Sequence, residues 1–161
     1  MPKRILAIAA IACLAGCTST PSPELAAIPG VKTRVLDDGY GTIVFESIDF
    51  ERNSDSSADT LENCVRRSVS RPESAPVADK TGVQISGVDS SVRQGYPAPF
   101  RYTLAASYGS PAKYHFDRIQ TSQDGFYGMP VGASKVMTPV NTYRTLEAVV
   151  DRIESCKKSS R

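Results

Sequence analysis

The chain has 161 residues, with 19 Lys and Arg against 17 Asp and Glu, and a formal net charge of +2. Lys3 and Arg4 account for this excess, so the rest of the chain carries equal numbers of basic and acidic residues. A nucleic-acid-binding protein would carry a net basic domain or a basic face, and the balanced charge argues against that class. The length allows one ordinary domain, and 40% hydrophobic with 22% charged residues is typical of a folded soluble domain.

The N-terminal segment has the features of an export signal. Lys3 and Arg4 precede an apolar run from Ile5 to Leu14. This run is too short to cross a bilayer as a helix, which needs about 20 residues. A short apolar run that follows positive charges and ends in small residues is typical of a signal peptide. We therefore expect residues 1–16 to be removed during export.

The end of this segment, Leu14-Ala15-Gly16-Cys17, resembles the lipobox of bacterial lipoprotein precursors. The resemblance covers the signal region only. It implies that a signal peptidase cuts between Gly16 and Cys17, and that Cys17 then carries acyl chains such as palmitate. Two or three such chains make a stable membrane anchor. Thr18 stands where an Asp would favour the inner membrane, so the resemblance further implies an outer-membrane protein that faces the periplasm. The alternative is ordinary secretion with cleavage elsewhere.

Residues 17–30 are rich in Pro, Ser and Thr and show no sustained hydrophobic period. Such a composition predicts a flexible tether between the lipid and a single globular domain at 31–161. The alternative is that the end of this segment is ordered, because Leu25 and Ile28 are able to pack.

Strands are predicted where apolar residues alternate with polar ones, or where β-branched and aromatic residues gather. The clearest alternation is that of Phe100, Tyr102 and Leu104 with their neighbours. The Pro- and Gly-rich segment 94–99 is expected to be a break, and the turn residues at 108–111 to join a hairpin. The predicted strands are 42–50, 83–88, 100–106, 113–119 and a short last strand at 136–140.

Two helices are predicted from apolar stripes of helical period. The first, at 59–69, begins with a capping box of Asp59 and Glu62. The second, at 141–158, is capped by Asn141 or Thr142. Its apolar stripe is Tyr143, Leu146, Val149, Val150, Ile153 and Cys156, with Glu154 off the stripe and Lys157 and Lys158 suited to the negative end of the helix dipole. Antiparallel strands with one early and one C-terminal helix predict an α+β two-layer sandwich.

The chain has four cysteines, of which Cys13 leaves with the signal peptide and Cys17 is lipidated. Cys64 and Cys156 remain, and each lies on the apolar stripe of a predicted helix. An even pair in an exported protein predicts a disulfide bond. The alternatives are two separately buried thiols or a redox pair, although a redox pair usually has the C-x-x-C spacing.

The single histidine, His115, is in a predicted strand with Asp117 on the same face. A hydrolytic triad would need a serine nearby, and Ser107, Ser110 and Ser134 are the candidates. A solvated surface pair is the more common arrangement, and no G-x-S-x-G elbow is present. One histidine supplies too few ligands for a catalytic zinc site. The chain also has no glycine-rich phosphate-binding motif, so we expect no metal and no cofactor.

The segment 125–132 combines three glycines and a proline with Phe126, Tyr127 and Met129. Exposed aromatic residues on a loop form a contact surface for a protein or a glycan. The alternative is that the loop folds back and covers one end of the sheet. Tyr96 and Phe100, beside Pro97 and Pro99, allow the same two interpretations.

These features predict an outer-membrane lipoprotein with a binding or structural role in the cell envelope and no enzymatic activity. Its partners would be the membrane, through the N-terminal lipid, and an envelope protein or glycan. One alternative is an inhibitor or immunity lipoprotein that neutralises an envelope-targeting enzyme. Another is a small cell-wall hydrolase that uses His115 and Asp117.

Overall fold

The computed structural model of the chain describes residues 21–55, 57–122, 128–134 and 138–160. The predicted signal peptide, the lipobox and Cys17 lie outside these residues. The strands are β1 (Val31–Val35), β2 (Ile43–Arg52), β3 (Arg71–Pro72), β4 (Val77–Ala78), β5 (Gly82–Arg93), β6 (Tyr96–Ser107) and β7 (Ala112–Thr121). The helices are α1 (Pro23–Ala26), α2 (Ala58–Ser68) and α3 (Pro139–Ser159).

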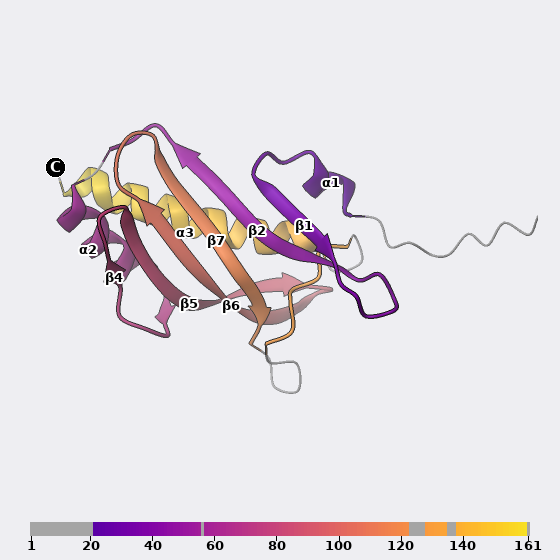
Figure 1. Ribbon diagram of the computed structural model, residues 1–161. Coiled ribbons are helices and arrows are strands. Elements are labelled where there is room, and N and C mark those ends of the chain that lie inside the picture. The colour runs from indigo at the N-terminus through magenta and orange to yellow at the C-terminus, as the bar shows by residue number, and fades with distance from the viewer. Residues whose placement is uncertain (1–20, 56, 123–127, 135–137, 161) are drawn as a thin grey trace, which may run out of the picture.

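One antiparallel sheet forms the first layer of the domain, and α2 and α3 form the second (Figure 1). Within the described chain the sheet has seven strands in the order β1-β2-β7-β6-β5-β3, and β4 also pairs with β5. The fold is therefore the predicted α+β sandwich. The predicted strands 42–50, 83–88, 100–106 and 113–119 correspond to β2, β5, β6 and β7.

Helix α2 begins at a different cap from the predicted one. Ser57 is the N-cap, and its Oγ accepts a hydrogen bond from the backbone N–H of Thr60 at 3.4 Å. Asp59 lies inside the first turn, where its negative charge still favours the positive end of the helix dipole. The predicted capping box of Asp59 and Glu62 is therefore wrong by two positions.

Helix α3 begins at Pro139, and the predicted strand at 136–140 is wrong for the part that the structure describes. Proline suits the first helical turn, because an N–H at that position would have no acceptor within the helix, so its absence costs no hydrogen bond. The φ angle of proline is also already close to the helical value. Asn141 and Thr142 do not cap the helix. Asn141 Nδ2 instead donates to the carbonyl of Val92 at 2.7 Å, and the Thr142 hydroxyl bonds to Ser91.

The predicted break at 94–99 is confined to Gln94 and Gly95, which both have positive φ and form a two-residue hairpin turn between β5 and β6. Pro97 and Pro99 are inside β6, before its pairing with β7 begins at Phe100. The carbonyl of Pro99 accepts from Ser122 on the side away from β5. The proline nitrogens therefore interrupt no bond of the β5–β6 ladder.

Residues 21–30 belong to the folded domain and not to a tether. Leu25, in α1, is only 1% exposed, and Ile28 packs against the core. The alternative interpretation is therefore correct for residues 21–30: this part of the segment is ordered and packs against the domain. What precedes Pro21 lies outside the described residues.

The core lies between the sheet and the two helices. Its largest side chains are Phe100, Tyr102, Tyr114 and Phe116, which are all buried. Gly87 of β5 allows Val69, at the end of α2, to approach the sheet, because a Cβ at Gly87 would overlap Val69 Cγ1. The opposite face of the sheet carries polar side chains.

Candidate functional site

The sulfur atoms of Cys64 and Cys156 lie 2.02 Å apart, which is the length of a disulfide bond. Cys64 is in α2 and Cys156 in α3, so the bond joins the two helices on one face of the sheet. This agrees with the predicted pairing. Cys64 is fully buried, and Cys156 is partly buried against the core in the last turns of α3.

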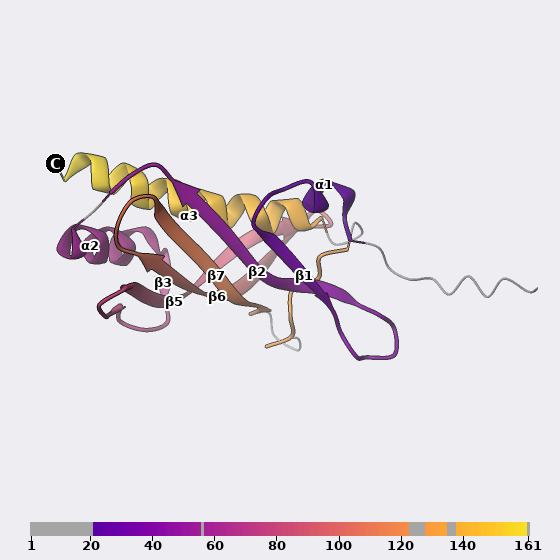
Figure 2. The same cartoon turned by 45° about the horizontal axis from the view of Figure 1, so that its top comes forward.

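Three segments that are distant in sequence meet at the opposite end of the domain. They are the β1–β2 loop, the β5–β6 turn and the segment 128–134 that follows β7, and both views show them away from the C-terminus (Figures 1 and 2). The segment 128–134 runs beside β2: Phe45 donates to the carbonyl of Val131 and Ala133 donates to the carbonyl of Ile43. It therefore takes the place of β7 next to the first half of β2.

These segments enclose a cavity of about 620 Å³, which we call the end groove. This volume is within the range of small-molecule sites, about 300–1,000 Å³. Its floor includes the buried residues Ile43, Val44 and Ala98, and its lining is largely apolar. The complete lining is Leu36, Asp38, Thr42, Ile43, Val44, Arg93, Gln94, Tyr96, Pro97, Ala98, Thr121, Met129, Pro130, Gly132 and Ser134.

Large apolar side chains are exposed around this groove. Tyr96 is 75% exposed and Met129 is 54% exposed, and both line it. Of the six large hydrophobic side chains that are exposed in the described chain, only Val77 in β4 belongs to the other end of the domain. We call the other five the apolar rim: Val35, Tyr40, Val92, Tyr96 and Met129.

The groove contains one cationic side chain, Arg93, at the end of β5. Arg93 is partly buried, and it forms no hydrogen bond or ion pair with any residue that the structure describes; its Nε is fully buried. Burial lowers the pKa of its guanidinium from the ordinary value. The groove also has one carboxylate, Asp38, whose Oδ1 accepts hydrogen bonds from the backbone N–H groups of Tyr40 and Thr42.

The predicted contact loop contributes to this groove through Met129, whereas Phe126 and Tyr127 lie outside the described residues. Tyr96 of the second ambiguous segment is exposed at the rim, and Phe100 is buried in the core. The aromatic, Gly and Pro composition of these two segments was the signal in the sequence that indicated a contact surface there. Nothing in the sequence indicated that Arg93 would join them.

His115 lies on the polar face of the sheet, and its nearest carboxylate is Asp49 rather than Asp117. Asp49 is directly opposite on β2, and its Oδ1 is 2.6 Å from His115 Nδ1. Both side chains are more than 40% exposed. Asp117 pairs with Thr103 in the neighbouring strand, and its buried Oδ1 has no hydrogen-bond partner in the described chain.

The three serines proposed as nucleophiles do not join this histidine. Within the described residues, no hydroxyl of Ser107, Ser110 or Ser134 forms a hydrogen bond to His115. Ser107 Oγ accepts from the backbone N–H of Lys113, and Ser134 lines the end groove. The hydrolase arrangement predicted as an alternative is therefore not assembled by these residues.

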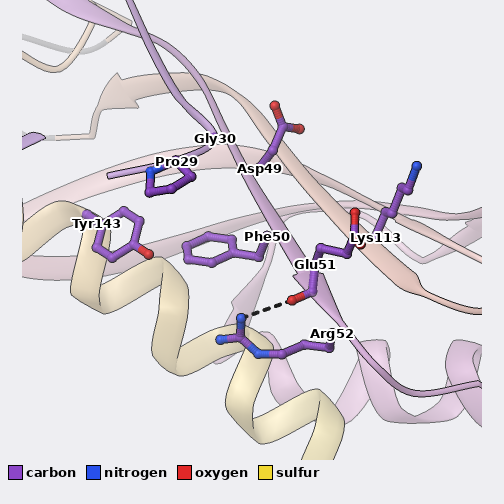
Figure 3. Close-up of a pocket in the computed structure, with 8 residues that line it drawn as sticks. All are labelled: Pro29, Gly30, Asp49, Phe50, Glu51, Arg52, Lys113 and Tyr143. Carbon is purple, nitrogen blue, oxygen red and sulfur yellow. Dashed lines mark hydrogen bonds between the residues drawn. The ribbon is translucent and has the colours of Figure 1, made fainter. Parts of the chain in front are cut away.

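A second cavity, of about 590 Å³, lies just before the first residue of β1, where β2 continues past Ile48 without β1 as a neighbour (Figure 3). Phe50 and Tyr143 lie close together next to α3, with ring centroids 5.1 Å apart. Arg52 donates to the carbonyl of Glu51 and to Asp151. Asp49 and Lys113 project away from the two rings (Figure 3). The arginine of this pocket is thus already paired, unlike Arg93.

A buried polar cluster near the C-terminus was missed by the sequence analysis. Lys157 Nζ lies 2.8 Å from Glu154 Oε1 and 2.8 Å from Ser54 Oγ, and the Tyr114 hydroxyl donates to Glu154. Burial alone would raise the pKa of Glu154, but the hydrogen bonds from Lys157, Tyr114 and Ser54 outweigh it and lower that pKa. Burial and the bond to Glu154 raise the pKa of Tyr114. Glu154 is therefore buried although it lies off the predicted apolar stripe, and Lys157 is buried with it.

Among the residues that the structure describes, no group of three His, Cys, Asp or Glu side chains is placed to hold a metal ion. Within the same residues, no helix is long and apolar enough to span a membrane.

Comparison of the chain with protein-family models, with curated proteins and with solved structures finds no match.

Proposed function

We propose that the protein is a lipoprotein of the bacterial outer membrane, anchored through lipid on Cys17, and that its domain acts in the periplasm by binding rather than by catalysis. The lipobox at 14–17 supports the anchor. The end groove supports the binding role, since it combines a cavity of ligand size with an exposed apolar rim.

One observation carries this proposal: the end groove lies where the chain enters the domain. Pro21 forms a β-bridge with Ser134, and Ser22 donates to the carbonyl of Ala133. Ser134 lines the groove. The groove is therefore at the membrane-proximal end of an anchored domain, where it reaches apolar components of the envelope.

The inhibitor alternative would use the same surface. Tyrosine is enriched at the energetic centres of protein interfaces, and Tyr40 and Tyr96 are both exposed here. In that alternative, the targeted enzyme would cover the apolar rim. The shape of the groove, which is a cavity and not a flat patch, favours a ligand that inserts an apolar segment.

The anchor is tested by fatty-acid labelling of cells that express the Cys17→Ser variant. We expect loss of lipid labelling and accumulation of a larger, unprocessed precursor. The matched control is Cys13→Ser, which should label and mature normally because Cys13 precedes the cleavage site. Normal labelling of the Cys17→Ser variant would refute the proposed anchor.

The binding role is tested by a photo-crosslinking side chain placed at position 96 and, as a control, at position 77. Both positions are exposed, but they lie at opposite ends of the domain. We expect adducts that form from position 96 and not from position 77. Equal adducts from both positions would indicate non-specific contact and contradict a site at the end groove.

A further inference from the structure

We propose that the end groove docks on the bilayer and holds one acyl chain of an anionic phospholipid, whose phosphate pairs with Arg93. This inference rests on the lipid anchor proposed above. The inference specifies the ligand of the end groove, whereas the binding role proposed above specifies none.

The length of chain between the anchor and the domain brings the groove to the membrane surface. Cys17 is four positions before Pro21. An extended chain spans at most about 3.6 Å per residue, so the two Cα atoms are at most about 14 Å apart. Pro21 is bridged to Ser134 in the wall of the groove. An acylated Cys17 therefore holds Pro21, and the groove wall bridged to it, close to the bilayer surface.

The chemistry of the apolar rim suits that position. Tyrosine is enriched where proteins meet the membrane interface, because its ring is apolar and its hydroxyl is polar. Tyr40 is in the β1–β2 loop, Tyr96 begins β6 after the β5–β6 turn, and Met129 lies in the segment that follows β7. Five of the six exposed large hydrophobic side chains in the described chain belong to this rim. Contact with lipid would remove them from water.

Arg93 supplies the charge that an anionic lipid needs. Its guanidinium has no partner among the described residues and is partly desolvated, so a phosphate would satisfy donors that are now unpaired. Arginine binds phosphate through two parallel N–H donors. Asp38, the one carboxylate in the groove, is already held by the amides of Tyr40 and Thr42.

The same argument favours a membrane phospholipid over the acyl chains on Cys17. The lipid on Cys17 consists of a diacylglycerol group and an amide-linked acyl chain, and it contains no phosphate. Its chains would fill the apolar floor and leave Arg93 unpaired. A partly buried donor without a partner is unfavourable. The phospholipid occupies the floor and pairs the cation at once.

The absence of tryptophan from the sequence allows a direct fluorescence test. The mature lipoprotein is purified from membranes with a single substitution, Tyr96→Trp, and inserted into vesicles of phosphatidylethanolamine and phosphatidylglycerol. Bromine on the acyl chains of the vesicle lipids quenches tryptophan on contact. The control is Val77→Trp, which is similarly exposed but lies in β4 at the other end. We expect quenching of Trp at position 96 and none at position 77.

The role of Arg93 is tested by carrying the bromine on phosphatidylglycerol alone or on zwitterionic phosphatidylcholine alone. Position 96 should be quenched more strongly by the brominated phosphatidylglycerol. In an added Arg93→Gln variant, the fraction of brominated phosphatidylglycerol needed for half-maximal quenching should rise roughly fivefold, the change for one basic residue at an anionic surface. Arg67→Gln, an exposed arginine in α2, should leave that fraction unchanged.

Each other outcome overturns the inference. A blue-shifted but unquenched Trp at position 96 would mean that the groove holds the chains on Cys17 or is covered by a second copy of the protein. Equal quenching at positions 96 and 77 would mean non-specific contact. If phosphatidylglycerol and phosphatidylcholine quench equally, the groove does not select an anionic phospholipid, and the role proposed for Arg93 fails. The mass of the purified protein separates these failures from failure of the anchor, because it reports the acyl chains on Cys17 independently of any quenching.

Discussion

Lys157 and Glu154 form an ion pair inside the domain, with Nζ 2.8 Å from Oε1 and both side chains at most 10% exposed. Removing two charges from water is costly, and their mutual attraction alone seldom offsets that cost. Ser54 and Tyr114 supply the additional hydrogen bonds that a buried pair needs. The cluster ties the last turns of α3 to β7 and to the loop after β2.

The lowered pKa of Glu154 predicts a loss of stability in acid. The folded protein binds this proton less tightly than the unfolded chain does, so the contribution is present above the unfolded pKa, about 4.3. It is lost as the pH falls through the lowered pKa. Glu154→Gln should reduce the free energy of unfolding by about 3–5 kcal/mol at neutral pH, because Lys157 stays buried without its partner. Urea unfolding between pH 2 and pH 7 should show a smaller loss on acidification in the variant than in the unmodified protein, whereas Glu46→Gln, at an exposed site, should keep the original profile.

The Cys64–Cys156 bond should stabilise the domain strongly, because the two positions are 92 residues apart. The chain-entropy account of a loop of that length gives about 4–5 kcal/mol, an upper estimate. Urea unfolding with and without reductant measures the difference. On non-reducing gels the faster mobility of the oxidised protein should disappear in Cys156→Ser. If it persists there, another pair of cysteines is responsible.

The contact between Gly87 and Val69 predicts a steric conflict. Gly87→Ala should lower the free energy of unfolding by about 1–3 kcal/mol, since its Cβ would overlap Val69 Cγ1. The double variant with Val69→Ala removes that methyl group and should lose less than the sum of the two single variants. Thermal or urea unfolding of the four proteins tests the coupling. Additive losses would show that the two residues do not meet.

The pair of His115 and Asp49 should contribute little to stability. Both side chains are more than one-third exposed, and exposed pairs are worth less than about 1 kcal/mol. His115→Ala should therefore unfold at nearly the same urea concentration as the unmodified protein. The same variant separates binding from catalysis: if it abolished hydrolysis of cell-wall material while remaining folded, the non-enzymatic function proposed above would fail.

Local patterns determined much of this fold before any tertiary contact was considered. The alternation in β6 and the apolar stripe of α3 follow from the periods of strand and helix, so both elements were found. The stripe also placed Cys64 and Cys156 on the buried sides of their helices. The resemblance of residues 14–17 to a lipobox rests on a contiguous pattern, so it requires no knowledge of the fold.

Short elements without a period were missed, because their partners stabilise them. β1 is an edge strand that depends on β2, and α1 is a single turn held by burial of Leu25. The boundaries of α2 and α3 moved by one or two residues. Ser57 caps α2 in place of Asp59, and Pro139 extends α3 toward the N-terminus as part of its first turn.

The sequence by itself predicted the class of fold and the pairing of the two cysteines, because each depends on local spacing or composition. The tertiary structure alone decided the end groove and the buried cluster. Arg93 and Tyr96 flank the β5–β6 turn, and only the packing of segment 128–134 beside β2 brings Met129 into the same groove. Glu154 and Lys157 resemble surface residues of a helix, and they are buried because the end of α3 lies over Tyr114 and Ser54.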